Sequence, residues 1–170
     1  EEKDYILLTP GNFHIDQRLY FGKNTKFYDG PIPKDYVLKN SDLLVVMTDL
    51  TKEMGILGNA VILNSQKRVL HNQRIGKVEV LNSDVDLVYL CFLLNSNLVR
   101  NHIKATATGT TVRHTSPKKM LNVKVSLPPL PEQTKIANFL TAIDDKINNA
   151  QAQLATAKQY KQGLLQQMFV

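Results

Sequence analysis

Hydrophobic positions in the first half of the chain come in short runs separated by turn residues. The runs "YILLT" (5–9), "DLLVVMT" (42–48) and "NAVILN" (59–64) are apolar and bounded by Gly, Pro, Asn or Asp, which predicts short strands. The stretch "NQRIGKVEVLN" (72–82) predicts a further strand pair or a strand followed by a turn. Two glycines in "TKEMGILGNA" (51–60) predict a loop between the second and third runs.

The hydrophobic period lengthens after residue 84. Leucines at 87, 90, 94 and 98 recur at spacings of three and four, which predicts one amphipathic helix with Asp84 or Asp86 as its N-cap. The Gly/Thr/Ser-rich stretch "ATGTTVRHTSPKKM" (107–120) predicts a loop, and "NVKVSLP" (122–128) alternates as a strand does.

The last 40 or so residues carry the most regular pattern in the chain. Pro128, Pro129 and Pro131 predict an extended corner, with Pro131 near the first turn of a helix, where proline is well tolerated. Positions at a 4-3-4-3 spacing then form a seam of period 3.5, the repeat of a coiled coil. This seam, whose apolar members we expect to mediate oligomerisation, comprises Ile136, Leu140, Ile143, Ile147, Ala150, Leu154, Ala157, Lys161, Leu164 and Met168.

The length of this helix predicts a partner helix. About 38 helical residues extend about 57 Å at about 1.5 Å each, whereas a domain of about 130 residues has a radius of about 15 Å. The alternative is a single core helix of the same domain. We expect an α+β fold in which a mixed α/β globular domain (1–127) leads through a proline corner (128–131) into one long C-terminal coiled-coil helix (132–170).

The net charge of +6 is concentrated in one segment of the chain. Residues 87–131 contain no Asp or Glu, and their cations match the whole net charge. Such asymmetry points to a polyanionic partner; a solvated basic face without a ligand is the alternative. The cations are Arg100, Lys104, Arg113, Lys118, Lys119 and Lys124.

Other features exclude several classes of protein. No window holds the roughly 18 apolar residues of a membrane span, so no membrane association is expected. The acidic N-terminus has too short an apolar run for a signal peptide, and the missing initial Met predicts a fragment or a processed chain. The single cysteine, Cys91, excludes an internal disulfide and a multi-thiolate zinc site, and its apolar run predicts a buried, inert thiol. These features fit the cytoplasm.

No catalytic constellation is present in the sequence. Its four histidines lack paired ligand spacing, and neither a phosphate-cradling glycine loop nor an adenine methyltransferase signature occurs. Asp144 and Asp145 are adjacent on a predicted helix, so they cannot face each other across a substrate. We therefore expect no catalytic residue, metal or cofactor.

Three polar loops are candidates for contacts with DNA. "TGTTVRHTS" (108–116) and "HNQRIGK" (71–77) combine phosphate-binding side chains with side chains that read bases. "MTDLTKEMG" (47–55) offers a lysine after a strand, although Asp49 and Glu53 should repel phosphate. The predicted DNA-binding residues are Lys52, Asn72, Gln73, Arg74, Lys77, Thr110, Thr111, Arg113 and His114.

The C-terminal motifs resemble a known family. "LPPLPEQTKIANFLTAIDDKI" (127–147) and "YKQGLLQQMF" (160–169) resemble the C-terminal conserved region of specificity (S) subunits of type I restriction-modification enzymes. "GTTVRHTSPKKMLNVKVSLPPL" (109–130) is similar to the end of a target recognition domain of that family, and "NSDLLVV" and "HNQRIGKV" match more loosely.

The resemblance implies a non-catalytic subunit that reads double-stranded DNA. S subunits of this kind recognise a split target with two domains, held apart by two antiparallel helices that also dock modification (M) subunits; a restriction (R) subunit then joins. This chain has one such domain, one helix and no Trp, so it corresponds to a half-subunit or fragment whose start is late. An unpaired helix predicts a homodimer through the seam.

Two alternatives remain open. One is a coiled-coil adaptor whose basic domain binds an acidic protein. The other is an enzyme domain whose active site is shared with a chain that is absent.

Overall fold

The strand β4 (Leu43–Val46) lies at the centre of the fold in the computed structural model, which describes residues 5–23 and 25–169. It pairs antiparallel with β6 (Ala60–Ile62) on one side and with β8 (Ile75–Val78) on the other. The strands predicted at 42–48 and 59–64 are thereby confirmed. The 72–82 stretch forms only the single strand β8 and not a strand pair.

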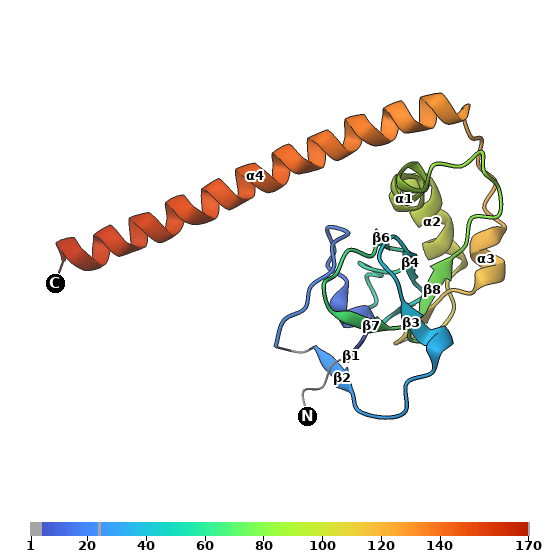
Figure 1. The fold of residues 1–170 in the computed structure, drawn as a ribbon, viewed down its shortest axis with the longest axis horizontal. Coiled ribbons are helices and arrows are strands. Elements are labelled where there is room, and N and C mark those ends of the chain that lie inside the picture. The colour runs from blue at the N-terminus through green and yellow to red at the C-terminus, as the bar shows by residue number, and fades with distance from the viewer. Residues whose placement is uncertain (1–4, 24, 170) are drawn as a thin grey trace.

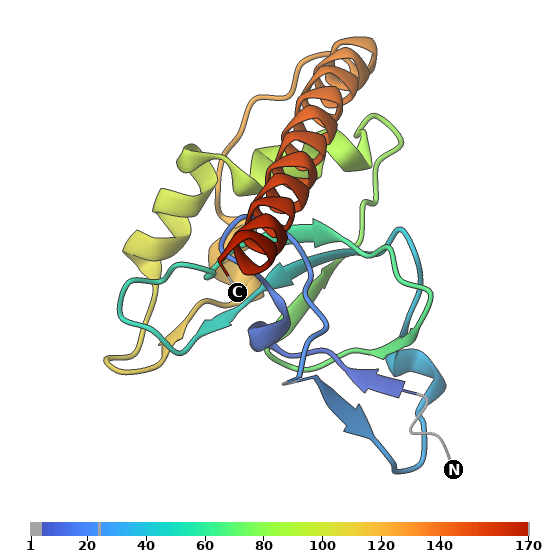
Figure 2. The ribbon, with the colours of Figure 1, turned by 90° about the vertical axis from the view of Figure 1, so that its left-hand side faces the viewer.

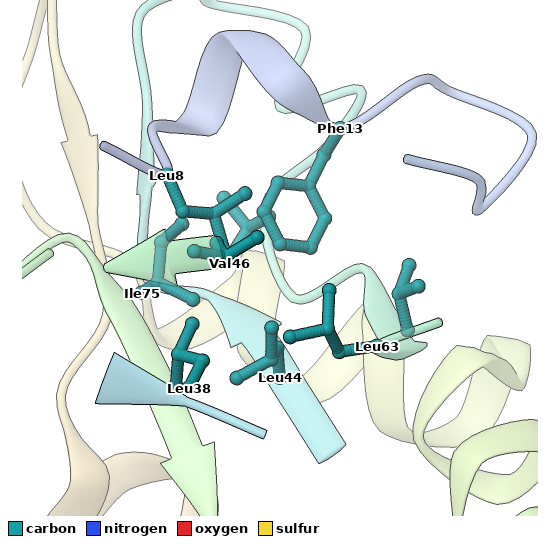
Figure 3. Close-up of a cluster of buried hydrophobic side chains, with 9 residues drawn as sticks. Leu8, Phe13, Leu38, Leu44, Val46, Leu63 and Ile75 are labelled. Carbon is teal, nitrogen blue, oxygen red and sulfur yellow. The ribbon is translucent and has the colours of Figure 1, made fainter. Parts of the chain in front are cut away.

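Both faces of β4 are buried, which explains its unbroken apolar run. Successive side chains of a strand point to opposite faces. Leu44 and Val46 enter one hydrophobic core (Figure 3), and Leu43 and Val45 enter another beneath helix α1 (Leu87–Asn95). A strand covered on both sides cannot alternate apolar and polar positions.

A second sheet covers the first core from the other side. Its order is β2-β1-β7-β3, with β1 and β7 parallel and the remaining pairs antiparallel. The strand predicted from "YILLT" is confirmed as β1. The bounds of this sheet and of the short 3-10 helices beside it are β1 Tyr5–Leu7, η1 Pro10–Asn12, β2 Lys26–Tyr28, η2 Lys34–Tyr36, β3 Val37–Leu38 and β7 Arg68–Leu70.

The single helix predicted after residue 84 is wrong, because the chain forms two. Helix α1 (Leu87–Asn95) and helix α2 (Asn97–Thr106) are separated at Ser96, whose extended backbone ends the first while its hydroxyl caps the second. Asp86 is confirmed as an N-cap, since its carboxylate accepts two backbone N–H groups of α1. Leu98, the last member of the leucine spacing that predicts one helix, lies after this break and is exposed.

The segment after α2 contains more structure than the predicted loop and lacks the predicted strand. Strand β5 (Thr48–Asp49) pairs with β9 (Arg113–His114), and α3 (Pro117–Leu121) follows. Within the described chain, residues 122–129 form no strand. Their alternating valines pack instead on side chains of other segments, Val123 beside the core of α2 and Val125 along a groove next to β8.

Helix α4 (Leu130–Met168) leaves this body of residues 5–127 as a long rod (Figures 1 and 2). Its base packs on α1, where Gln133 and Ala137 are buried. Every residue from Thr141 to Gln162 is exposed. The prediction that a rod of this length extends beyond the domain is confirmed, and the alternative of a single core helix is wrong.

Candidate nucleic-acid interface

Met47, between β4 and β5, brings two of the predicted DNA-binding segments to one end of the sheet. Its backbone N–H donates to the carbonyl of Arg74 (2.9 Å), and its carbonyl accepts the N–H of Thr115 (3.0 Å). The 72–74 turn and the 108–114 hairpin therefore flank the same residue. The 50–57 loop starts at this end of the sheet too, because it follows β5 directly.

The 108–114 hairpin is held to β5 by its last two residues. The register places His114 opposite Thr48, and their side chains share a hydrogen bond between Nδ1 and Oγ1 (3.0 Å). Arg113 Nη1 donates to the carbonyl of Gly109 (2.7 Å), so the guanidinium lies back over its own hairpin. Gly109 has a φ of +95°, a conformation that favours glycine. Between these contacts, Thr110 and Thr111 are exposed at the tip.

Asp49 organises the loop that carries Lys52. The carboxylate is 1% exposed and accepts four hydrogen bonds. Two come from the backbone and hydroxyl of Thr51 (2.8 Å each), and two from the backbone N–H groups of Ile56 and Leu57 (2.8 and 3.1 Å). Asp49 thus fixes both ends of the loop, and Lys52 is exposed between them.

Arg100 is a structural cation and does not belong to the basic surface predicted from residues 87–131. It is buried on α2, where Nη1 donates to the side chain of Asn59 and Nη2 to the carbonyl of Gly55 (2.9 Å). Burial lowers the pKa of Arg100, and the charge of Asp49 opposes that shift. Gly58 allows α2 to pack closely against this part of the body, because a Cβ at position 58 would lie 2.8 Å from Cδ1 of Ile103.

The 72–74 turn presents two exposed candidates. Asn72 Oδ1 accepts the N–H of Arg74 (3.0 Å), which closes the turn, and Gln73 and Arg74 are exposed. Lys77 lies three residues further along β8, and Nζ forms an ion pair with Asp42 at 3.1 Å. The structure therefore brings the 72–74 turn and the 108–114 hairpin together at Met47, with Lys52 in the loop after β5, whereas Lys77 pairs with Asp42.

The joint between the body and α4 depends on Gln133, which sequence reasoning did not single out. Gln133 is 1% exposed; Oε1 accepts the N–H of Asp86 (3.0 Å), and Nε2 donates to the carbonyls of Asp84 (3.0 Å) and Pro128 (2.8 Å). Thr134 also donates to the carboxylate of Asp86 (3.1 Å). The sequence signal for this role is the Gln of "PEQ" (131–133), since a polar residue in the first turn of a helix can bond to backbone groups of the segment that precedes the helix.

The apolar seam is largely uncovered. Ile136 and Leu140 are half-buried near the joint, whereas Ile147, Leu154 and Met168 are 47%, 55% and 71% exposed.

Among the described residues there is no cluster of three or more potential metal ligands. In that same part of the chain, no helix is both long enough and apolar enough to cross a membrane.

Comparison with known proteins identifies the family. Residues 22–159 match the family model described as the type I restriction modification DNA specificity domain. The chain belongs to this family. Membership confirms the resemblance to specificity subunits that the C-terminal motifs indicate.

Curated relatives of this specificity domain are longer proteins. The chain is 28% identical over 141 residues to the type I restriction enzyme MjaVIII specificity subunit of Methanocaldococcus jannaschii, covering 83% of this chain and 32% of that protein. It is 29% identical over 150 residues to the EcoBI specificity subunit of Escherichia coli, covering 85% of this chain and 29% of that protein. The chain thus spans about a third of the length of these relatives.

Solved structures show the same fold. The HsdS subunit from Thermoanaerobacter tengcongensis aligns with a TM-score of 0.60 at 14% identity, over 85% of this chain and 37% of that one. A type I restriction-modification S subunit from M. genitalium aligns with a TM-score of 0.51 at 19% identity, over 67% and 28%. The predicted α+β class with a long C-terminal helix is confirmed.

Proposed function

We propose that this chain is a non-catalytic DNA-reading module that recognises one half of a bipartite target within a type I restriction-modification complex. The observation that carries the proposal is that two polar loops meet at Met47 and a third starts at the same end of the sheet, in a member of the DNA specificity domain family. Phosphate contacts would come from Lys52 and the hydroxyls of Thr110 and Thr111. Base contacts would come from Arg113, His114 and the 72–74 turn, whose side chains carry the donors that match base edges.

In this proposal α4 acts as a spacer. Two copies pair through the seam, the two domains lie at a fixed separation, and each domain binds one half-site. M and R subunits acquire their target sequence by assembling on this frame. The length of the helix and its uncovered apolar positions support the role.

Selection from a random duplex library tests the proposed function. The whole chain is incubated with the library, bound DNA is sequenced, and the affinity for the enriched duplex is measured between 50 and 200 mM salt. We expect a defined motif and a binding constant that falls steeply with salt, because Lys and Arg displace counterions from phosphates. Absence of an enriched motif would refute sequence recognition by this chain.

The adaptor alternative makes the opposite prediction. A basic domain that binds an acidic protein would enrich no DNA motif, and its affinity for a duplex would be the same whatever the DNA sequence. The clustering of Asn, Gln, Arg and His with the hydroxyl residues favours DNA, since recognition of an acidic surface requires cations and not base-reading amides.

A further inference from the structure

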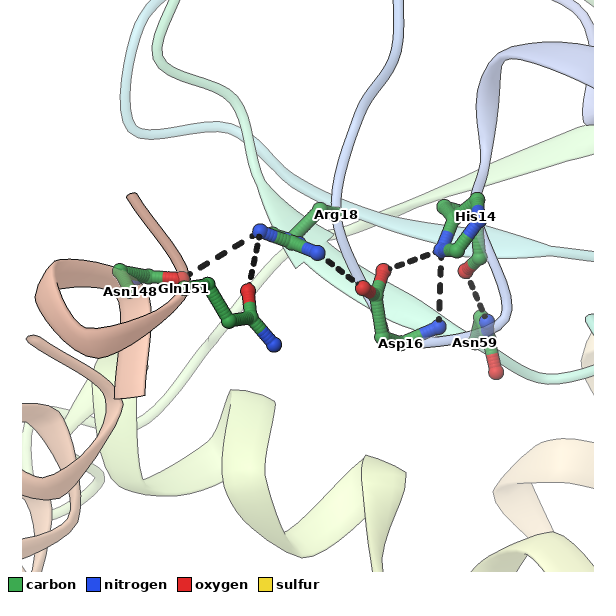
Figure 4. Close-up of polar contacts among 6 residues, drawn as sticks. All are labelled: His14, Asp16, Arg18, Asn59, Asn148 and Gln151. Carbon is green, nitrogen blue, oxygen red and sulfur yellow. Dashed lines mark hydrogen bonds and ion pairs between the residues drawn. The ribbon is translucent and has the colours of Figure 1, made fainter. Parts of the chain in front are cut away.

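The body contacts α4 at a second place, far along the rod from the joint. Arg18 Nη1 lies 3.3 Å from Oδ1 of Asn148 and 3.5 Å from Oε1 of Gln151 (Figure 4). Asn148 lies about 22 Å from Gln133 along the helix, at about 1.5 Å per residue. The rod is therefore held at two separated points and not at its base alone.

The turn that carries Arg18 is closed and aligned by its own hydrogen bonds. The N–H of His14 donates to the carbonyl of Arg18 (2.8 Å), and the N–H of Gln17 donates to the carbonyl of His14 (3.1 Å). Asp16 bonds to both the Arg18 guanidinium and the His14 ring. The hydrogen bond from Arg18 holds the pKa of Asp16 below its ordinary value, despite opposing desolvation. The hydrogen bonds within the turn thus fix the position of the Arg18 guanidinium independently of its contact with α4.

This turn is also anchored to the interior of the body. Asn59, which is 0% exposed, donates from Nδ2 to the carbonyl of His14 (2.9 Å) and accepts from Arg100 on α2. Arg100 in turn holds Gly55 in the 50–57 loop. A continuous set of hydrogen bonds therefore runs from the loop of the proposed DNA interface through Asn59 to the turn that contacts α4.

A cleft of about 410 Å³ lies beside this contact, and Arg18, Asn148 and Gln151 are part of its lining. It is lined by apolar side chains of α1 and β6 on one side and by α4 on the other, with Cys91 in its wall. Because this space is not filled by packed side chains, the body can swing towards or away from the rod unless Arg18 holds the two together.

We propose that Arg18 is a positioning residue that sets the angle between the body and α4, and thereby the half-site spacing that the protein accepts. The proposal rests on the proposed function. A swing of about 10° about the joint moves a point about 25 Å away in the domain by about 4 Å, given the size of such domains. That shift is close to the rise of about 3.4 Å per nucleotide along a DNA strand. The contact therefore decides between neighbouring spacer lengths.

Alkylation of Cys91 tests the angle without DNA. The whole chain, Arg18→Ala and the double variant Asn148→Ala/Gln151→Ala are treated with iodoacetamide at pH 8.5. Lys67→Ala, which removes an exposed cation that does not line the cleft, is the matched control. Opening the cleft should make alkylation several-fold faster in both contact variants and leave the control unchanged. Equal rates in all four proteins would overturn the proposal.

Spacer dependence tests the consequence for recognition. Binding is measured on duplexes that carry two copies of the selected half-site at a series of separations, and on a duplex with a single half-site. For Arg18→Ala we expect a broader spacer profile with unchanged single-site affinity. An equally narrow profile would contradict the proposal, as would loss of single-site binding, which would make Arg18 a DNA contact. If the unmodified chain recognises no half-site, the proposed function fails, and the alkylation rates still decide the role of Arg18.

Discussion

Gln133 at the start of α4 accepts a hydrogen bond from the backbone of Asp86, 47 residues earlier in the chain. Asp86 is also the N-cap of α1, so the same residue starts α1 and contacts the first turn of α4. The two helices that meet at the joint are therefore fixed by a single polar cluster and not by apolar packing alone.

Replacing Gln133 by Ala should weaken this joint. The change leaves the N–H of Asp86 and the carbonyls of Asp84 and Pro128 without the bonds that Gln133 makes, and such losses cost about 1–3 kcal/mol. Urea denaturation of Gln133→Ala should show this loss. Gln159→Ala, at an exposed position of α4, should remain within about 0.5 kcal/mol of the unmodified chain. Equal stability of the two variants would contradict the role of Gln133.

Asp49→Asn should loosen the 50–57 loop. The amide keeps one acceptor oxygen but turns an NH₂ group towards two of the donors that the carboxylate now satisfies. We expect a loss of about 1–3 kcal/mol and faster amide hydrogen exchange at Ile56 and Leu57. Asp35→Asn, at an exposed acid, is the control. Unchanged exchange at both amides would show that the carboxylate does not hold the loop.

Arg113 and Lys52 should affect DNA binding differently. Arg113→Ala should weaken binding to the selected duplex by about 1–3 kcal/mol with little effect on random DNA, as expected for a base contact. Lys52→Ala should weaken both and lower the salt slope by about 1, as expected for a phosphate contact. Fluorescence anisotropy titrations at several salt concentrations measure both effects. Equal losses on cognate and random DNA would remove Arg113 from the base-reading set.

The seam should make the chain a homodimer. Leu154 is 55% exposed in the single chain, and a charge there would have to be buried on pairing. Equilibrium sedimentation at tens of micromolar should give a dimer for the unmodified chain and for Gln159→Glu, which lies outside the seam, but a monomer for Leu154→Glu. A monomeric unmodified chain would refute the pairing.

Cys91 should resist ionisation in the folded state. Burial raises the pKa of its thiol to about 11 from an ordinary value of 9.0, and the charge of Asp144 adds to the effect while a backbone hydrogen bond opposes it. The unfolded chain then loses this proton at lower pH than the folded chain. Cys91 therefore contributes stability that is present below pH 9 and is lost as the pH rises towards 11. Unfolding of the chain and of Cys91→Ala, compared across this window, should show a difference that shrinks with pH. A constant difference would contradict the raised pKa.

Local patterns predicted the elements that depend on short-range chemistry. The run at 42–48 predicts a strand, Asp84 or Asp86 predicts a helix start, and the seam predicts the rod. The hydrophobic spacing does not predict the break at Ser96, because the leucine spacing continues across it. The hydroxyl of Ser96 caps α2 by accepting a backbone N–H group, and this bond does not alter the hydrophobic pattern.

Contacts between distant segments could not be predicted in the same way. Arg18 and Asn148 are 130 residues apart, and both are ordinary polar residues in their local sequence. Met47 joins two candidate loops through its backbone, which leaves no trace in side-chain chemistry. The loops themselves were predicted as contacts one by one, but only the strand register shows that they lie at one end of the sheet.

If the chain reads DNA and pairs through the seam as proposed, the exposed outer part of α4 would make recognition depend on the amount of protein present. The stretch from Ala152 to Met168 is little longer than the about 12–15 residues below which isolated helices are marginal in water, and Gly163 within it lowers helix propensity further. If two copies pair through the seam as proposed, pairing would stabilise this stretch as a helix. The pair would join two short sequences into one long target, whereas a single chain would read one short sequence with lower selectivity. The concentration of the chain would then set how many sites in a genome qualify.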